Sequence, residues 1–375
     1  MKVLISGAGI AGLATGIALR QAGYEVEVFE RSLELREIGA GLMIWPNGAR
    51  SLQALGVTVK ARTLTRVAVY SWRGRLLNDF PVRTISERYG AEACFVHRAD
   101  LQAALAETFG GDGLYLDAAV AGFNDDGVGV EVKLGDGSVA AGDFLVSADG
   151  LRSPVRRQLL RDGDPVYLGS TIWRGIVDDD GIRFPSDAVI NWAGRGAEFI
   201  ACHLADKRIY WAAVTKEPRG ERAGPEGHKV DLAQRFGNWV EPVPTLIAAA
   251  IDTAIVRNDM YDRAPAHRWS EGRVTLVGDA AHPMTPNAGQ GACQALEDAI
   301  ALSTSLQRTS NLNDAFGLYE SRRLRRANRV VAMSRQGTRA TQVDNPLLCV
   351  LRDSVASLLP RRLFLSTMEA ILDPA

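Results

Sequence analysis

The sequence of 375 residues contains little that would serve a metal site, a disulfide framework, a membrane span or nucleic acid. Its four cysteines, Cys94, Cys202, Cys293 and Cys349, include no CxxC pair and have no histidine at ligand spacing, which indicates neither zinc nor disulfides and favours a reducing compartment. No stretch approaches the ~18 uninterrupted apolar residues of a membrane span, and the first apolar run is too short for a signal peptide. The net charge of −1 offers no basic surface for nucleic acid. We therefore expect a cytoplasmic protein with no metal and no nucleic acid partner.

The first thirty residues contain a strand, a glycine turn, a helix and a second strand. Val3–Ser6 is a short apolar run typical of a buried parallel strand, and the turn Gly7-Ala8-Gly9-Ile10-Ala11-Gly12 follows it. An Ala- and Leu-rich helix comes next, and the strand Glu25–Phe29 ends at Glu30. This order is typical of a dinucleotide-binding unit.

Each part of this unit has a physical role. Gly7 permits the tight turn, Gly9 lets a pyrophosphate approach the backbone, and Gly12 brings the helix against the strand. Glu30 would accept hydrogen bonds from the adenosine ribose, and an acid at this position argues against a 2′-phosphate. The pattern therefore predicts bound FAD or NAD.

Two further strands end at an aspartate. Asp143–Ala148 stops at Asp149-Gly150, which by itself is also typical of a plain turn, and Arg273–Val277 stops at Gly278-Asp279. Open parallel sheets bind ligands at the carboxyl ends of their strands, so both acids are expected at one crevice. At this crevice Asp279 can accept hydrogen bonds from the ribityl hydroxyls of FAD.

The stretch 278–298 is the most informative in the chain. Pro286-Asn287 predicts an irregular loop, Gly289 and Gly291 remove side chains from it, and the sequence becomes helical from Ala292. A helix N-terminus with bare amides suits a flavin, because reduction places negative charge at the N1/C2=O edge of the ring.

Together these elements resemble the group A flavoprotein hydroxylases, the class of 4-hydroxybenzoate hydroxylase. The segments 39–48 (Gly-Ala-Gly-Leu-Met-Ile-Trp-Pro-Asn-Gly) and 286–291 (Pro-Asn-Ala-Gly-Gln-Gly) are most similar to the salicylate hydroxylase, urate hydroxylase and zeaxanthin epoxidase branch, and the likeness extends to about Arg326. The resemblance implies an α/β fold with a Rossmann-like GxGxxG FAD-binding domain, an inserted antiparallel-sheet substrate domain and a C-terminal helical segment.

The resemblance also implies roles for particular residues. Arg98 matches an arginine that reaches the ribityl and pyrophosphate region, with Asp100 as the N-cap of the following helix, and Asp149 matches an element linked to both FAD and NAD(P)H. Pro283 matches a proline that lines the flavin ring, and Arg36 and Gly41 lie where the family wraps a loop around it. The expected cofactor-binding residues are Gly7, Gly9, Gly12, Glu30, Arg31, Arg36, Gly41, Arg98, Asp149, Asp279, Pro283, Gly289, Gly291 and Ala292.

The chain between about Tyr167 and Asp262 has a different pattern. Its runs alternate in polarity and contain aromatics, which predicts an antiparallel sheet with one face available to roof a pocket, and Tyr70–Gly74 should add a strand. The expected domains are an FAD-binding domain of residues 1–70, 92–165 and 263–345, a substrate domain of residues 71–91 and 166–262, and a C-terminal helix of residues 346–375.

The pocket residues are candidates only. Trp173, His203, Tyr210 and Trp211 could line the pocket, although sheet aromatics more often belong to the core. His203 could deprotonate a phenol or be a structural histidine, and we interpret His282 as architectural. The tail from Pro346 to Leu372 could cap the substrate tunnel, form a dimer contact or lie on a membrane, and we favour capping.

No second dinucleotide fingerprint is present, so NAD(P)H is expected to bind transiently and reduce the flavin. The resemblance implies a single-component monooxygenase in which O2 forms a C4a-hydroperoxyflavin that oxygenates a small aromatic or apolar substrate. Epoxidation of an olefinic or isoprenoid substrate is an alternative, and a flavoprotein that binds an aromatic ligand without oxygenating it is another. We expect a monomer or homodimer and no membrane partner.

Overall fold

A computed structural model describes the whole chain except residues 36–39, 221–223, 225 and 373–375, so the predicted contact of Arg36 lies outside the described residues. Buried strands of one half form a six-stranded sheet that is parallel except at its first pair, as the short apolar runs predict. In spatial order these strands are β18 (Ser270–Glu271), β19 (Val274–Leu276), β12 (Phe144–Ser147), β1 (Lys2–Ser6), β2 (Glu25–Phe29) and β8 (Leu114–Tyr115).

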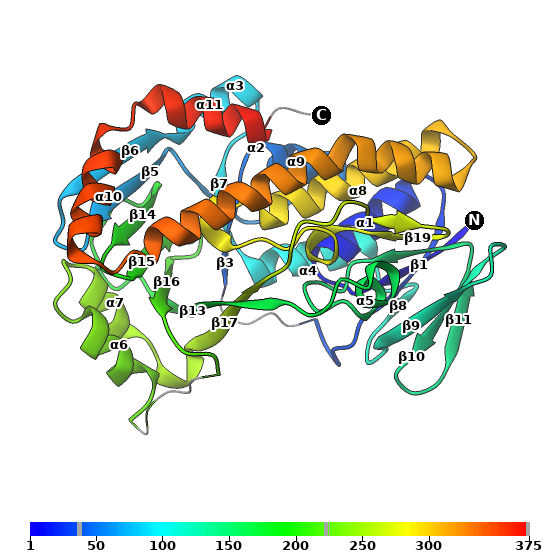
Figure 1. Cartoon of the computed structure of the whole chain (residues 1–375), viewed down its shortest axis with the longest axis horizontal. Coiled ribbons are helices and arrows are strands. Elements are labelled where there is room, and N and C mark those ends of the chain that lie inside the picture. Colours follow the sequence, from blue (N-terminus) through cyan, green and yellow to red (C-terminus); the bar gives the residue numbers. More distant parts are fainter. Residues whose placement is uncertain (36–39, 221–223, 225, 373–375) are drawn as a thin grey trace.

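Helices cover this sheet and bring distant parts of the chain together. α1 (Ile10–Gln21) packs against both α4 (Arg98–Phe109) and α8 (Gly291–Arg308), and α8 packs against α9 (Leu312–Thr341). α9 runs across the molecule from the six-stranded sheet to the other half (Figure 1). The expected N-cap role of Asp100 is wrong, because α4 begins two residues earlier, with His97 as its N-cap, and Asp100 lies in the first turn.

A seven-stranded sheet forms the other half. Its strands in spatial order are β17 (Val256–Asp262), β13 (Val166–Asp178), β16 (Arg208–Lys216), β15 (Ala197–His203), β14 (Ala188–Ala193), β5 (Arg66–Ser71) and β6 (Leu76–Pro81). The pairs are antiparallel as expected, except that β5 and β14 are parallel. β5 begins before the expected boundary at residue 70 and ends at Ser71, so the division of the chain into domains stays a proposal.

The two faces of the seven-stranded sheet belong to different cores. The outer face packs against α6 (His228–Phe236) and α7 (Val243–Ala249) in a core of its own. The inner face carries Ile172, Tyr210 and Val214, which join the core of the first half. Because side chains alternate along a strand, each inner-face residue has outer-face neighbours on both sides in sequence.

Two three-stranded sheets and three further α-helices make up the rest of the described fold before the tail. A three-stranded sheet consists of β3 (Gly41–Ile44), β7 (Cys94–His97) and β4 (Arg62–Thr63), and β9 (Val120–Asp125), β10 (Val130–Leu134) and β11 (Val139–Gly142) form another. The remaining helices before the tail are α2 (Pro46–Ala54), α3 (Val82–Tyr89) and α5 (Pro154–Leu160).

The tail forms two helices, α10 (Pro346–Leu358) and α11 (Arg361–Leu372), and both contact β6 at the edge of the seven-stranded sheet. The inward face of α10 carries Cys349 and Arg352, whereas its apolar side chains point outward. Within the described part of the chain, no helix combines the length and the apolar character needed to cross a bilayer. The outward apolar residues of α10 are Leu347, Leu348, Val350, Leu351, Val355 and Leu358.

A buried carboxylate, Asp298 of α8, joins the end of β19 to α9. Its Oδ2 accepts hydrogen bonds from the backbone N–H of Gly278 at 2.9 Å and from His282 Nε2 at 2.5 Å, and its Oδ1 accepts one from Arg323 Nε at 2.8 Å. Burial would raise the pKa of Asp298, but the charges of His282 and Arg323 lower it to about 2. The interpretation of His282 as architectural agrees with this geometry.

Asp298→Asn should destabilise the fold by about 3–5 kcal/mol, because it leaves Arg323 and His282 without their buried counter-charge. An unfolded aspartate has a pKa of about 3.9, so the carboxylate contributes its full stability above about pH 4 and loses it as the pH falls toward 2. Denaturant unfolding of wild type and variant between pH 7 and pH 3 measures this. The difference in free energy of unfolding between wild type and variant should become smaller below pH 4. Equal free energies of unfolding at pH 7 would contradict the stabilising role of Asp298.

Candidate active site

The glycine turn after β1 leaves the N-terminus of α1 open. Gly7 has a φ of +97°, and a Cβ on it would lie 2.7 Å from the carbonyl oxygen of Ala148. A Cβ on Gly12 would lie 1.8 Å from the carbonyl oxygen of Gly7, so only glycine lets helix and turn approach this closely. Gly9 is the N-cap of α1, without a side-chain cap and with open space above it. A phosphate could therefore accept hydrogen bonds from the first amides of α1.

Glu30, at the end of β2, lies beside this turn. Its Oε2 accepts a hydrogen bond from the backbone N–H of Ala8 at 2.8 Å, and its Oε1 accepts one from Ser32 N–H at 3.0 Å. A carboxylate has about four acceptor positions, so capacity remains for ribose hydroxyls. The neighbouring Arg31 is exposed. Gln102 of α4 also supports the turn, by donating to the carbonyl of Ala8 at 3.0 Å, and its sequence context gave no signal of this role.

The two strand-end aspartates differ in their surroundings. Asp149 accepts hydrogen bonds from the hydroxyls of Ser147 and, at 3.2 Å, Ser6. Burial raises the pKa of Asp149, and these hydroxyl donors oppose the rise. Asp279, by contrast, is exposed to solvent. Desolvation by the protein around the crevice raises the pKa of its carboxyl group, and the nearby charges of His282 and Arg98 oppose that rise.

The loop of residues 279–290, between β19 and α8, is held from several sides. The fully buried guanidinium of Arg156 donates to the carbonyls of Ala280 and Ala281, both at 2.9 Å, and Trp45 Nε1 donates to the carbonyl of Ala288 at 3.2 Å. Pro283 is buried within the loop, whereas Pro286 is exposed. Pro286 is therefore more accessible to a bound ring than the predicted Pro283.

The loop ends in a second open helix N-terminus. Gly289 has a φ of +59°, and α8 begins at Gly291 without a side-chain cap. A Cβ on Gly291 would be in ordinary contact with Met284 Cγ, at 3.9 Å. Ala292 is half-buried in the first turn. Gly41 is closely packed, because a Cβ there would lie 2.3 Å from Phe95 Cε1, and its expected contact with the flavin stays a prediction.

These features fit FAD. Two helix N-termini with free amides can bind the pyrophosphate and the negatively charged edge of a reduced flavin, and the accessible carboxylate of Asp279 can accept hydrogen bonds from ribityl hydroxyls. The structure brings the predicted glycines and acids to the carboxyl ends of neighbouring parallel strands, which is where open parallel sheets bind their ligands.

Only one of the four pocket candidates lies on the inner face of the seven-stranded sheet. Trp173 and Trp211 belong to the outer core with α6 and α7. His203 also lies on the outer face, 4.2 Å from the ring of Phe184, and burial lowers its pKa while Asp179 opposes this. Tyr210 faces inward and packs against Phe95.

The strand register defines the rest of the inner face. Ile172 of β13, Val214 of β16 and Glu198 of β15 lie side by side in one row, and Ala212 and Ile200 lie in the next. Around this apolar centre are Asn191 of β14, which is opposite Ile200, and Arg174, which is opposite Ala212. The sequence analysis missed Glu198, although a lone acid within an otherwise apolar alternating run was a usable signal.

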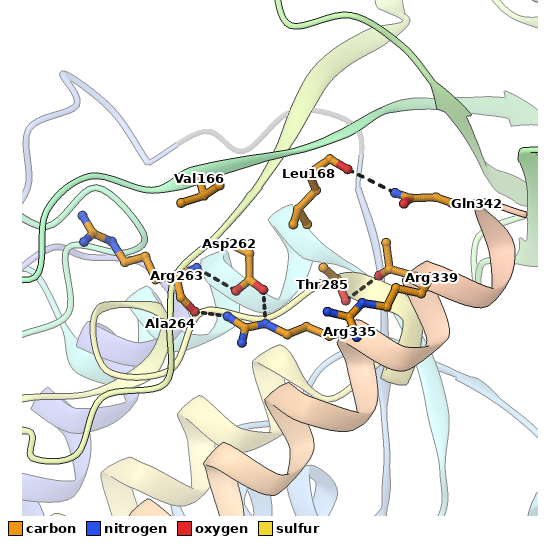
Figure 2. Close-up of a pocket in the computed structure, with 10 residues that line it drawn as sticks. Val166, Leu168, Asp262, Arg263, Ala264, Thr285, Arg335, Arg339 and Gln342 are labelled. Atoms are coloured by element: carbon orange, nitrogen blue, oxygen red, sulfur yellow. Dashed lines mark hydrogen bonds and ion pairs between the residues drawn. The ribbon is translucent and has the colours of Figure 1, made fainter.

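A side cavity of about 280 Å³ lies beside the 279–290 loop (Figure 2). Val166 and Leu168 of β13 form one side, and Arg335 and Arg339 of α9 lie across from them. Arg335 is paired with Asp262, whereas the side chain of Arg339 is exposed. The cavity is also lined by Asp262, Arg263, Ala264, Thr285, Thr338 and Gln342.

Comparisons with known proteins agree with this geometry. Residues 1–334 match the FAD-binding domain family. The chain is 39% identical over 360 residues to the aurachin C monooxygenase/isomerase of Stigmatella aurantiaca, covering 95% of this chain and 93% of that protein. It is 33% identical to an FAD-dependent urate hydroxylase of Klebsiella pneumoniae, covering 90% and 89%. The crystal structure of Klebsiella pneumoniae HpxO complexed with FAD and uric acid superposes with a TM-score of 0.93 at 31% identity, over 99% of this chain and 96% of that chain.

Asp279→Ala should lose most of its FAD, because it removes the accessible carboxylate of the crevice. The measurement is the ratio of flavin to protein after purification, together with a dissociation constant from flavin fluorescence quenching. Asp126→Ala, in an exposed turn, serves as the control. Flavin retention equal to wild type would contradict the assignment of Asp279.

Glu30→Ala should weaken FAD binding roughly tenfold, because a charge-assisted hydrogen bond to the ribose is lost together with the support of Ala8. Titration of the apoprotein with FAD gives the affinity, and Glu107→Ala on exposed α4 surface is the matched control. If both variants bind FAD like wild type, the ribose contact is wrong.

Proposed function

Because the chain belongs to the group A flavin monooxygenases and is an FAD-dependent enzyme of that class, we propose that it uses NAD(P)H and O2 to hydroxylate a small aromatic or polycyclic substrate. The observation that carries the proposal is the juxtaposition of an FAD crevice with an apolar sheet face. The 279–290 loop reaches that face, because Asn287 donates to Glu198 of β15 at 3.3 Å.

Bound FAD supplies the electron transfer and oxygen activation that no side chain of the site can provide. The chain's own residues bind and orient it. Gly9, Glu30 and the first amides of α1 would hold the ADP end, Asp279 the ribityl hydroxyls, and the amides at Gly291 the ring edge that becomes negative on reduction.

The inner face would keep water from the reacting atoms. Ile172, Ala212 and Val214 are buried and offer no hydrogen-bonding groups through their side chains. Excluding water prevents the oxidising equivalent from being lost as H2O2 and leaves the substrate as the available acceptor.

The side cavity offers a place for the phosphates of transiently bound NAD(P)H. Arg339 projects from α9 at this cavity, and Thr285 of the cofactor loop also lines it. Guanidinium groups suit phosphate oxygens because their donors match them in pairs. A nucleotide at this cavity would lie next to the flavin crevice without needing a second glycine fingerprint.

Hydroxylation and epoxidation start from the same oxygen activation, and the relatives include an epoxidase. The chain is 33% identical over 331 residues to the chloroplastic zeaxanthin epoxidase of Solanum lycopersicum, of which it spans 50%. The polar groups at the edges of the inner face favour hydroxylation of a ring with polar substituents over epoxidation of a purely apolar olefin.

Purified holoenzyme should consume NADH or NADPH faster when its substrate is present and yield a product heavier by one oxygen atom. Screening aromatics and isoprenoids for stimulated NAD(P)H oxidation, with product mass and H2O2 measured in parallel, tests this. Ligands that bind and are always recovered unchanged would show a non-oxygenating flavoprotein.

Arg339→Ala should raise KM for NAD(P)H roughly three- to tenfold at low salt and leave FAD content and kcat unchanged, because only a phosphate contact is removed. Arg325→Ala, also exposed on α9 and ~21 Å away along the helix, is the control. An unaltered KM in the Arg339 variant would place the nucleotide elsewhere.

A further inference from the structure

One corner of the inner face holds a buried polar cluster that cofactor binding does not use. Glu198 is 2% exposed and accepts hydrogen bonds from Asn191 Nδ2 at 3.2 Å and from Asn287 Nδ2 at 3.3 Å. Asn287 in turn accepts a hydrogen bond from Thr338 Oγ1 of α9 at 2.6 Å. The cluster therefore joins the seven-stranded sheet, the cofactor loop and α9.

This arrangement leaves one acceptor unused. Glu198 engages the amide nitrogen of Asn191, so the amide oxygen points elsewhere, and within the described part of the chain this buried Oδ1 has no hydrogen-bond partner. A buried acceptor is normally hydrogen-bonded in a folded protein, and a ligand that supplies a donor is one way to satisfy this one, which lies on the inner face. The neighbours of Asn191 in the register, Ile200 and Val69, are apolar and cannot do so.

The charge of the corner disfavours anions. Burial raises the pKa of Glu198, while Asn191, Asn287 and Arg352 oppose the rise. An ionised Glu198 would repel a carboxylate, and a neutral one would offer it no counter-charge. Arg352 is already bound to Asp353 at 2.8 Å and to the carbonyl of Gly194 at 2.9 Å.

The cations with inward register positions are paired or distant. Lys216 of β16, two residues from Val214, forms a salt bridge with Asp344 at 2.8 Å. Arg174 lies two strands and two residues from Glu198 in the register, roughly 12 Å away. It donates to Asn258 Oδ1 at 2.9 Å. Among the residues that the structure describes, none of these cations is therefore a free positive charge next to an anionic group at the Glu198 corner.

We propose that Asn191, positioned by Glu198, is the polar anchor of the substrate, and that the substrate is a neutral aromatic ring bearing an O–H or N–H donor rather than a carboxylate. The inference rests on the proposed function, since it names the substrate class of that site. The donor satisfies Asn191 Oδ1, and the ring lies over Ile200 and Ala212. Glu198 acts as a positioning residue because it fixes the orientation of the Asn191 amide.

Three naphthalenes that share one ring system test this on the holoenzyme without NAD(P)H. 2-Naphthol has a neutral donor, 2-methoxynaphthalene has none, and 2-naphthoate is an anion. Their dissociation constants come from the change in flavin absorbance on titration. Wild type should bind 2-naphthol at least tenfold more tightly than either of the others. Equal affinities, or a preference for 2-naphthoate, would overturn the proposal.

Variants of Asn191 and Glu198 distinguish a role in anchoring the ligand from a purely structural role. Asn191→Leu should abolish the preference for 2-naphthol over 2-methoxynaphthalene, because the acceptor is lost. It should keep the affinity for 2-methoxynaphthalene within about twofold, because Glu198 loses the Asn191 donor but keeps its hydrogen bond from Asn287. Glu198→Leu should lose the same preference, whereas Glu198→Gln should keep it within about threefold, since an amide can still hold Asn191. Retention of the full preference in Asn191→Leu or Glu198→Leu would refute the anchor.

Flavin content and melting temperature, measured for every variant, show whether the fold is intact, and Glu107→Gln on exposed α4 is the matched control. Oxygenation is not part of this binding test. If the proposed substrate class is wrong, the wild-type protein will not prefer 2-naphthol in the binding test. If the proposed function is wrong, the ligand will be recovered unchanged after NAD(P)H oxidation.

Discussion

The buried carboxylate of Asp298 is the constraint on which the cofactor crevice depends. It binds the backbone at Gly278, the ring of His282 and the guanidinium of Arg323, and so ties β19, the 279–290 loop and α9 to one point. The loop can then leave its amides at Gly291 and the carboxylate of Asp279 free for a ligand. A buried anion with fewer partners would be unstable, which is why the loop, α8 and α9 must keep their relative positions.

Side chains alternate between the two faces of the seven-stranded sheet, and the two faces have different functions. Its outer aromatics, including Trp173 and Trp211, fill a core with α6 and α7 and give the sheet its rigidity. Its inner face is mostly aliphatic, so it can exclude water beside the cofactor loop. Its polar groups lie at the edges of the apolar surface, and one of them, Glu198, meets Asn287 of the loop. The large aromatics that stand out in the sequence thus serve stability, and smaller neighbours face the site.

The halves of the molecule are joined by elements that contribute to both. α9 carries Arg323 at the Asp298 centre and, several turns later, Thr338 and Arg339 beside the loop and the side cavity. β13 and β17 begin or end at the same cavity. The tail contributes Arg352 near Glu198. The apolar side chains of α10 face outward, whereas Met368, Ile371 and Leu372 of α11 are buried. The expected capping of the substrate tunnel by the tail stays a prediction.

The sequence by itself determined the parts whose signal is local. Glycine spacing and strand-end acids placed Gly7, Gly9, Gly12, Glu30, Asp149 and Asp279, because a tight turn or a bare helix N-terminus restricts the residue type at each position. Only the tertiary structure decided which side chains meet at the substrate face. A strand pattern reveals that its two faces differ, but which face turns inward depends on distant partners such as α6, α7 and the 279–290 loop. For the same reason Trp173, Trp211 and His203 lie on the outer face, whereas Glu198, Asn191 and Arg156 reach their partners only once the chain has folded.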